Sequence, residues 1–185
     1  MKLDVWEGLV YEPREDSELL LKHVQENCKG KVLDMGCGSG VLGIGAAMSG
    51  CEVTCVDVNP LALNLTKHNC KLNNVKTRLV FSDLFKNVHE RFDFIVFNPP
   101  YLPDADYPAR DLTGGIKGNE LTIKFLEEAK HFLKDNGQIL LNVCSLSSPD
   151  ETFKKIEGLG YSFQILEKFK MPWEELYVVK LSVLK

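Results

Sequence analysis

The tetrapeptide Asn98-Pro99-Pro100-Tyr101 has the residue types needed to hold a planar amino group. It ends the apolar segment 92–98, and its two prolines stop a strand and remove two backbone donors. Pro100 also restricts Pro99 to an extended conformation, which fixes the direction of the Pro99 carbonyl. The Asn98 side-chain oxygen and the Pro99 main-chain oxygen are then two acceptors for the two hydrogens of an NH2 group.

Such a turn can do chemistry as well as bind. Holding both hydrogens points the nitrogen lone pair at an electrophile, so orientation and charge withdrawal supply most of the catalysis without a basic side chain. Tyr101 can lie flat against the planar group and exclude water. The alternative interpretation is a simple strand-ending turn, and the residues upstream favour the catalytic one.

A glycine-rich segment, D-M-G-C-G-S-G at 34–40, lies between a predicted strand and a predicted helix. Gly36 and Gly38 permit a tight turn and a close approach of a ligand to the backbone. The spacing G-x-G-x-x-G within residues 38–43, with an acid about 20 residues later, also matches a dinucleotide fingerprint. Asp34, however, would repel a pyrophosphate and attract an ammonium group. The loop therefore favours a ligand that has an amino-acid end and no phosphate.

Two more acidic residues stand at the ends of the next two predicted strands. Asp57 can accept hydrogen bonds from both hydroxyls of a ribose. Asp83 can accept from an adenine amino group, while Leu84 covers a face of the ring. Together with Asp34 these residues predict a site for S-adenosylmethionine, which contains an amino acid, a ribose and an adenine. We therefore predict a methyltransferase that acts on a planar NH2 nitrogen held at Asn98.

Alternating strands and helices must position these residues. Strands are predicted at 31–36, 51–58, 77–83, 92–98, 138–145, 161–170 and 175–184, and helices at 13–28, 40–49, 60–72, 119–134 and 150–158. Repeated strand–helix–strand units predict an α/β fold, a doubly wound and mostly parallel seven-stranded sheet with an antiparallel C-terminal hairpin. This is the Rossmann-like class I methyltransferase fold. Ligands bind beyond the carboxyl ends of such strands, where all these motifs fall.

Size and composition fit one domain over residues 1–185, with 44% hydrophobic and 26% charged residues. The N-terminus has no apolar stretch of signal-peptide length and no later run approaches a membrane span, so we expect a cytoplasmic protein without membrane contact. The net charge of −4 and the lack of a basic run argue against direct nucleic-acid binding.

Six cysteines are scattered along the chain without a C-x-x-C pair, which predicts reduced thiols and not a disulfide framework. The nearest approach to a metal-binding cluster is Cys51, Cys55, His68 and Cys70. The first two lie in a predicted strand and the others lie on a predicted helix, so we expect no metal site.

Several motifs together resemble the protein glutamine methyltransferases that modify class I translation release factors. They are Y-E-P-R-E-D-S (11–17), D-M-G-C-G-S-G (34–40), V-D-V-N-P (56–60), S-D-L-F (82–85) and N-P-P-Y (98–101), and T-G-G-I-K-G-N-E (113–120) is similar to that family's glycine-rich segment. The resemblance extends over residues 8–184. Bacterial members carry an extra N-terminal helical domain, so the compact chain resembles the archaeal and eukaryotic branch.

The resemblance implies that the substrate is the glutamine of the Gly-Gly-Gln loop in a release factor. It implies substrate contacts from Asn98, Pro99, Pro100 and Tyr101, and it adds Ser17 to the predicted cofactor contacts of Asp34, Gly36, Gly38, Asp57, Asp83, Leu84 and Asn98.

Members of that branch commonly work with a small zinc-binding activator protein. The strand 77–83 is predicted at a sheet edge, where a strand of a partner can pair with it. The alternative is an edge protected by Lys76 and Arg78.

Three other functions fit parts of the pattern. A nucleic-acid methyltransferase that acts on an exocyclic amino group of adenine or guanine would use the same turn, but the acidic balance and the lack of a target-recognition domain oppose it. A protein lysine methyltransferase must deprotonate an amine, and two acceptors suit a planar group better. An inactive cofactor-fold subunit is opposed by the intact Asp34, Asp57 and Asn98.

Overall fold

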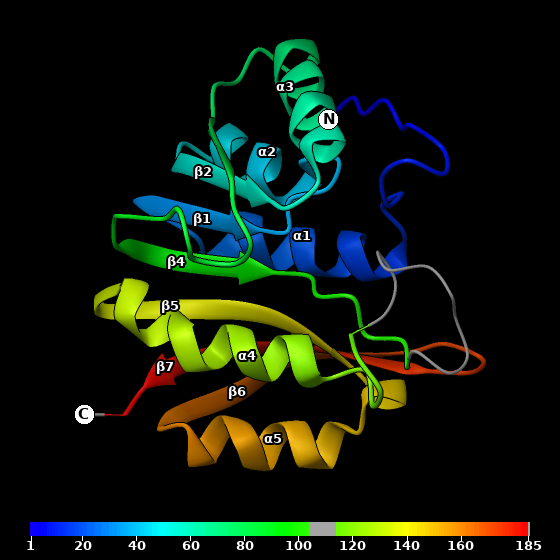
Figure 1. Ribbon diagram of the computed structural model, residues 1–185, viewed down its shortest axis with the longest axis vertical. Helices are drawn as coiled ribbons and strands as arrows, with labels where there is room; N and C mark the ends of the chain where they lie inside the picture. Colours follow the sequence, from blue (N-terminus) through cyan, green and yellow to red (C-terminus); the bar gives the residue numbers. More distant parts are fainter. Residues whose placement is uncertain (104–113, 185) are drawn as a thin grey trace.

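The computed structural model describes residues 1–103 and 114–184, and its centre is a seven-stranded sheet (Figure 1). The strands are β1 (Lys31–Met35), β2 (Glu52–Asp57), β3 (Arg78–Phe81), β4 (Phe92–Phe97), β5 (Leu133–Cys144), β6 (Tyr161–Lys170) and β7 (Glu175–Val183). Their order is β3-β2-β1-β4-β5-β7-β6, in which β1 to β5 pair in parallel and β7 is antiparallel to β5 and β6. The predicted sheet with its antiparallel C-terminal hairpin is confirmed.

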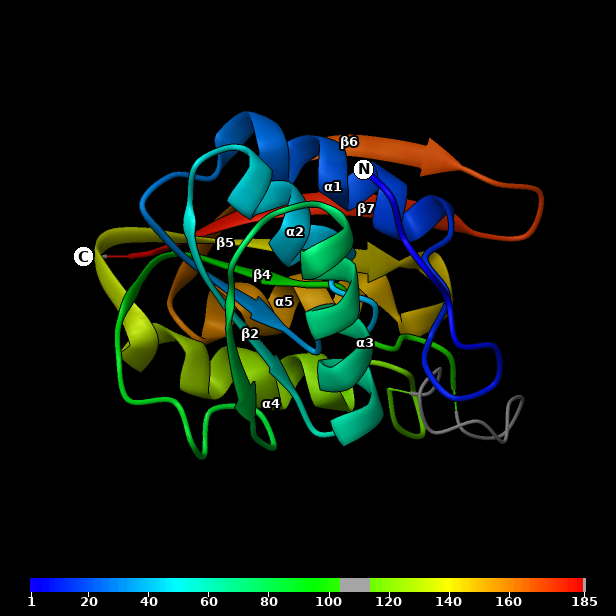
Figure 2. The same ribbon diagram turned by 90° about the horizontal axis from the view of Figure 1, so that it is seen from above.

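Helices cover both faces of the sheet (Figure 2). They are α1 (Glu15–Asn27), α2 (Val41–Met48), α3 (Pro60–Leu72), α4 (Glu120–Ala129) and α5 (Pro149–Gly158). The first three lie on one face, and α4 and α5 lie on the other. Among the described residues, no helix combines the length and the apolar character needed to cross a membrane.

The alternation of side chains along β1 divides the core into two layers. Leu33 is buried with Phe125 of α4, whereas Val32 is buried with Leu20 of α1. Because successive side chains of a strand point to opposite faces, Asp34 points to the same face as Val32, toward α2. The strand therefore presents its backbone, and not this carboxylate, at its carboxyl end.

The predicted helix 119–134 is wrong at its C-terminal end. The helix α4 ends at Ala129, a 3-10 turn follows, and β5 begins at Leu133 and not at 138. Leu133 is buried and pairs with Phe92 of β4. Apolar residues at 129, 132 and 133 fit a continuing helix as well as a turn into a strand, so only the pairing with β4 decides between them.

The strand β3 lies at an edge of the sheet, as the sequence predicts. It is shorter than 77–83, because only Arg78–Phe81 pair with β2. Arg78 forms an ion pair with Glu90 at 2.8 Å, and the Phe81 side chain is 56% exposed. No strand among the described residues covers the outer side of β3.

Gly43 of α2 lies so close to β1 and β2 that an added methyl group would overlap its neighbours. A Cβ there would lie 2.6 Å from Cys55 Sγ and 2.9 Å from Asp34 Oδ2. We expect Gly43→Ala to lower the free energy of unfolding by about 1–3 kcal/mol, measured by urea denaturation. Gly158→Ala is the matched control, because Gly158 is also helical and nothing lies within 4 Å of its added group. Equal effects of the two substitutions would contradict this packing argument.

Candidate active site

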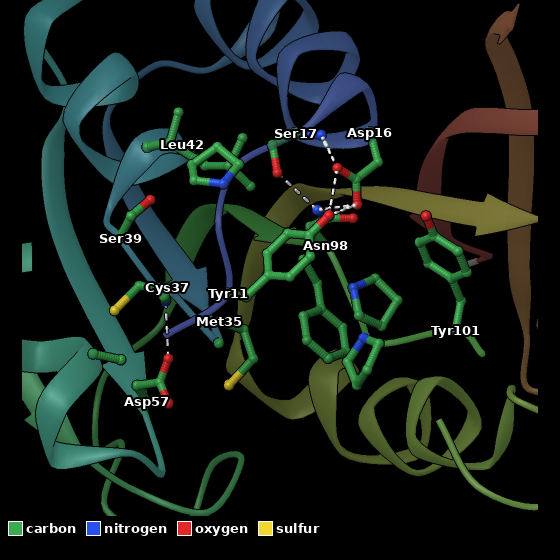
Figure 3. Close-up of a pocket in the computed structure, with 18 of the residues that line it drawn as sticks. Tyr11, Asp16, Ser17, Met35, Cys37, Ser39, Leu42, Asp57, Asn98 and Tyr101 are labelled. Carbon is green, nitrogen blue, oxygen red and sulfur yellow. Dashed lines mark hydrogen bonds between the residues drawn. The ribbon is translucent and has the colours of Figure 1, made fainter. Parts of the chain in front are cut away.

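A cavity of about 770 Å³ lies beyond the carboxyl ends of β1, β2 and β4 (Figure 3). This volume is ordinary for a small-molecule site. The structure brings together at its wall all the predicted site residues except Asp34: Ser17, Gly36, Gly38, Asp57, Asp83, Leu84, Asn98, Pro99, Pro100 and Tyr101. Residues far apart in the sequence therefore share one cavity at the edge where the parallel strands end.

Asp34 lies behind the glycine loop and does not line the cavity. Its side chain is buried, Oδ2 accepts a hydrogen bond from Gly43 N at 2.8 Å, and Oδ1 has no partner among the described residues. Burial raises the pKa of Asp34 to about 7, while the Gly43 hydrogen bond opposes this rise. Strand alternation turns this carboxylate toward α2, and the contact of Asp34 with the ammonium group of a ligand stays a prediction.

The glycine loop and Asp57 form one wall of the cavity. Gly36 and Gly38 adopt φ angles of 62° and 54°, which glycine tolerates best. Asp57 Oδ2 accepts from Gly38 N at 2.9 Å, and Oδ1 accepts from Asn59 N at 2.8 Å. Burial raises the pKa of Asp57, and these backbone hydrogen bonds oppose that effect. Since Gly38 N already binds a carboxylate, a phosphate at this loop would meet negative charge where it needs a donor.

Residues 82–84 form the adjoining wall, after β3. Asp83 is partly exposed and its Oδ2 accepts from Lys86 Nζ at 2.6 Å, which lowers the pKa of Asp83. Leu84 is buried and has a φ of 47°, an unusual value for a branched side chain. This conformation places an apolar residue beside a carboxylate at the cavity wall, as an adenine ring requires.

The side-chain amide of Asn98 is held at both ends. Its Nδ2 donates to Asp16 Oδ2 at 3.0 Å and to Ser17 Oγ at 3.2 Å (Figure 3). Its Oδ1 accepts from Asn142 Nδ2 at 2.9 Å. Because a carboxylate only accepts hydrogen bonds, the Asn98 nitrogen must face Asp16 and the oxygen must face away from it. One lone pair of Oδ1 then stays available to an incoming donor.

Pro99 and Tyr101 complete the wall next to Asn98. The Pro99 carbonyl oxygen, the second predicted acceptor, takes no hydrogen bond from residues 1–103 and 114–184. Burial raises the pKa of Tyr101 well above its ordinary value, and the charges of Asp16 and Glu174 add to this. Tyr101 therefore presents a neutral ring and hydroxyl.

Sequence reasoning missed three residues that hold this wall together: Tyr11, Asp16 and Asn142. The Tyr11 hydroxyl donates to both oxygens of Asp16 at 2.9 Å, and Ser17 N donates to Asp16 Oδ1 at 2.6 Å. Tyr11 and Asp16 belong to the motif 11–17, whose spacing alone indicates only the start of a helix. Asn142 did leave a signal, because it is an amide within the apolar segment 138–145.

Two glycines press the segment 114–120 against the turn at Asn98. A Cβ at Gly114 would lie 2.5 Å from the Pro100 carbonyl oxygen, and a Cβ at Gly118 would overlap the Tyr101 carbonyl. Side chains at these positions would push the turn out of place. This part of the glycine-rich segment therefore supports the cavity wall from outside, while residue 113 lies outside the described residues.

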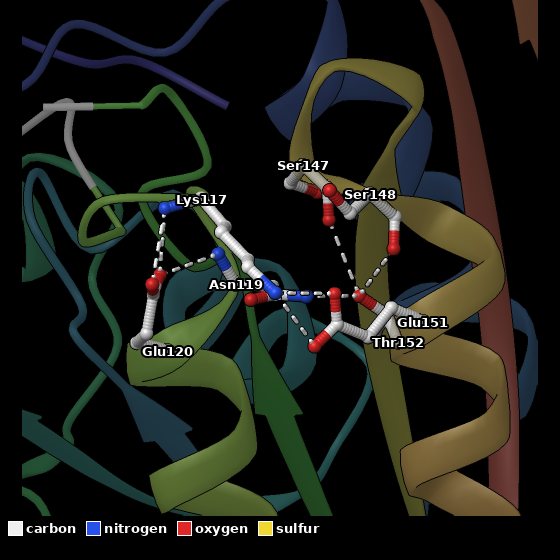
Figure 4. Close-up of polar contacts among 7 residues, drawn as sticks. All are labelled: Lys117, Asn119, Glu120, Ser147, Ser148, Glu151 and Thr152. Atoms are coloured by element: carbon white, nitrogen blue, oxygen red, sulfur yellow. Dashed lines mark hydrogen bonds and ion pairs between the residues drawn. The ribbon is translucent and has the colours of Figure 1, made fainter. Parts of the chain in front are cut away.

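Polar contacts fix the same segment to α5 (Figure 4). Asn119 is buried, and its Nδ2 donates to Thr152 Oγ1 at 3.1 Å. Lys117 Nζ forms an ion pair with Glu151 at 2.9 Å on the surface. The buried contact contributes more than the exposed pair, which solvent screens. The support of the turn thus extends to α5, which lies on the same face of the sheet as α4.

All six cysteines are free and buried. Burial raises the pKa of the Cys28 thiol well above its ordinary value, and a hydrogen bond with Cys55 together with burial raises the pKa of Cys37, so both thiols stay protonated. In the part of the chain that the structure describes, no three His, Cys, Asp or Glu side chains form a group that could hold a metal ion.

The raised pKa of Asp34 predicts a pH dependence of stability. Because this pKa is about 7 in the folded protein and near ~4 in an unfolded chain, the folded state binds more protons between these values. The contribution of Asp34 is therefore complete below the unfolded pKa and is lost as pH rises through the folded one. In the wild type the free energy of unfolding should therefore decrease between about pH 4 and pH 7. We expect Asp34→Asn to remove up to roughly 4 kcal/mol of this decrease, measured by urea denaturation at several pH values in this range. Parallel pH profiles for the two proteins would contradict it.

Comparison with known proteins shows the family to which the chain belongs. The methyltransferase small domain matches residues 13–159. A Methanocaldococcus jannaschii protein assigned as a protein N5-glutamine methyltransferase is 41% identical over 92% of this chain and 90% of its own length. The release factor glutamine methyltransferase of Deinococcus radiodurans is 33% identical over 74% of this chain. The match covers 55% of the length of that relative.

Two further likenesses bear on the alternatives. A ribosomal RNA small subunit methyltransferase C of Hamiltonella defensa is 38% identical over 69% of the chain but only 35% of its own length. The solved structure of the E. cuniculi Mtq2–Trm112 complex, which methylates the eRF1 translation termination factor, superimposes with a TM-score of 0.76 at 29% identity over 95% of this chain and 99% of that one. The chain therefore belongs to the methyltransferase small-domain family and, within it, to the protein glutamine methyltransferases.

Proposed function

We propose that the protein transfers a methyl group from S-adenosylmethionine to the side-chain amide nitrogen of the glutamine in the Gly-Gly-Gln loop of a translation release factor. The observation that carries this proposal is the fixed orientation of Asn98, whose nitrogen faces Asp16 and whose oxygen keeps a lone pair for a donor. The relatives that methylate release factors support the choice of substrate.

The cavity fits the cofactor. Asp57 carries a lone pair on each oxygen beyond its backbone hydrogen bonds, as two ribose hydroxyls require. Asp83 and Leu84 offer an acceptor and an apolar surface for adenine, and the backbone of Gly36 and Gly38 lies at the wall without side chains. Bound S-adenosylmethionine supplies an electrophilic methyl group on a sulfonium. The carboxylate on Gly38 N disfavours the dinucleotide alternative, whose phosphates need that donor.

The turn at Asn98 binds and orients the amide. Asn98 Oδ1 and the Pro99 carbonyl oxygen accept the two hydrogens of the substrate NH2 group. These hydrogens become more acidic as the nitrogen forms its new bond, so both hydrogen bonds strengthen toward the transition state. Breaking of the bond between sulfur and methyl would leave a neutral thioether, and one of the two protons would then pass from the nitrogen to water. The Asp16 side chain accepts from Asn98 Nδ2, and this hydrogen bond polarises the amide and makes its oxygen a better acceptor. Tyr101 covers the planar group without a charge.

Two observations disfavour the alternative substrates. A lysine must lose a proton before methylation, but the Asp16 carboxylate is already occupied by donors from Tyr11, Ser17 and Asn98. For nucleic acids, the charged residues that line the cavity are predominantly acidic, namely Glu15, Asp16, Asp57, Asp83 and Glu174 against Arg14. Such a rim repels a phosphate backbone.

The open edge of β3 supports a partner at that side of the sheet. Phe81 is exposed there, and Arg78 forms an ion pair with Glu90. We assign this edge to a small zinc-binding activator protein, which adds a strand or packs on Phe81. The E. cuniculi relative forms a complex with Trm112, which supports a partner protein for this chain as well.

The central test is transfer of labelled methyl groups to a release factor, to transfer and ribosomal RNA, to DNA and to histones, with and without the activator. We expect labelling of the release factor that disappears when its loop glutamine is changed. Asn98→Ala should abolish at least about 99% of the rate, since it removes an acceptor that acts in the transition state. The control is Asn64→Ala. Asn64 lies on the exposed side of α3 and outside the cavity wall, so this variant should keep full activity.

The outcomes separate the candidates. Equal labelling of nucleic acid would displace the protein-glutamine assignment, and labelling of histones alone would favour a lysine methyltransferase. Failure of the wild-type protein to bind S-adenosylmethionine by calorimetry would favour an inactive cofactor-fold subunit.

An exposed tryptophan marks where a protein substrate meets the cavity. Trp173, in the turn between β6 and β7, is 90% exposed and lines the cavity rim. We expect Trp173→Ala to raise the KM for the release factor at least about fivefold and to leave the affinity for S-adenosylmethionine unchanged. Phe169→Ala is the matched control, because Phe169 is an exposed aromatic residue outside the cavity wall. The same KM for the two variants would refute a substrate contact at Trp173.

A further inference from the structure

Asn142 of β5 is an amide in the interior of the protein. Its side chain is fully buried, and its neighbours along the strand, Leu141 and Val143, are apolar. Burying a primary amide costs free energy unless hydrogen bonds replace those made with water. An aliphatic residue would fill this space without that cost, so the amide needs a reason that lies in its contacts.

The contacts of Asn142 lead to the turn at Asn98. Asn142 Nδ2 donates to the Asp16 carbonyl oxygen at 2.9 Å and to Asn98 Oδ1 at 2.9 Å, which uses both of its hydrogens. Asn142 Oδ1 has no partner among the described residues. Turning the amide around would place this oxygen against two other oxygens, so the neighbours fix its orientation.

Asn142 therefore completes the restraint on Asn98 from the side opposite Asp16. The Asp16 carboxylate and Ser17 hold the Asn98 nitrogen, and Asn142 holds the oxygen. We propose that Asn142 is a positioning residue that aims the free lone pair of Asn98 Oδ1 at the NH2 group of the substrate. This inference rests on the proposed function, because it assigns that oxygen the role of acceptor in methyl transfer.

A positioning role predicts a change in rate more than in binding. A misaimed acceptor still lets the substrate enter but loses a hydrogen bond that strengthens in the transition state. Asn142→Leu, which has a similar volume, should lower kcat by about 10- to 100-fold, the equivalent of one hydrogen bond of roughly 1.4–2.8 kcal/mol. The KM for the release factor and the Kd for S-adenosylmethionine should stay within about twofold.

The pH dependence of kcat in Asn142→Asp distinguishes a positioning role from a merely structural one. An ionised carboxylate would face two acceptors and push Asn98 away, whereas a protonated one can donate its hydrogen to Asn98 Oδ1. Burial raises the pKa of such a carboxyl group. Relative to the wild type, kcat of Asn142→Asp should therefore rise as pH falls. The control is Asn27→Asp, a half-buried amide at the far end of α1 that donates to the His23 carbonyl oxygen and lies outside the cavity wall, and its pH profile should follow that of the wild type.

The experiment separates this inference from the proposed function. If the wild-type protein does not methylate the release factor, the proposed function fails. If the wild type is active and Asn142→Leu, folded by circular dichroism, keeps the wild-type kcat, the positioning role is overturned. If Asn142→Leu does not fold, the pH profile of Asn142→Asp decides: recovery at low pH supports the role, and a profile parallel to that of the wild type overturns it.

Discussion

The arrangement of the site depends on the hydrogen bond between Asn98 Nδ2 and the buried Asp16 carboxylate. An amide can present either its nitrogen or its oxygen, and only the oxygen can accept the hydrogens of a second amide. Asp16 removes this ambiguity because it cannot donate. It is itself held by Tyr11 and by Ser17 N at the start of α1. The helix that opens the chain therefore sets the chemistry of a turn that lies 82 residues later.

Close packing also holds the turn at Asn98 in place. Glycines at 114 and 118 let one segment approach the Pro100 and Tyr101 carbonyls, and the contact of Asn119 with Thr152 ties that segment to α5. Weak nucleophiles such as amides gain most from accurate placement, so a catalyst for them needs fixed acceptors more than it needs a strong base. In this protein the acceptors follow β4, and side chains of α1 and β5 hold Asn98 in place.

The three predicted acids, Asp34, Asp57 and Asp83, act in different ways although each lies at or near the carboxyl end of a parallel strand. Asp57 and Asp83 reach the cavity wall, where they can accept from a ligand. Asp34 is one residue before the end of β1 and points toward α2, where it accepts from Gly43 N beneath the glycine loop. A shift of one residue along a strand reverses the face on which a side chain lies. The acid nearest the loop in sequence thus supports the loop and does not line the site.

The sequence by itself determined the elements whose signals are local. Asn59 and Pro60 begin α3 through a side-chain cap on Leu61 N, the strand–helix alternation specifies the parallel sheet, and the paired prolines end β4 at Asn98. Only the tertiary structure decided the rest. The end of α4, the direction of Asp34 and the contact of Asn142 with Asn98 depend on residues tens of positions away, and no local pattern encodes which lone pair remains free once those distant groups have packed together.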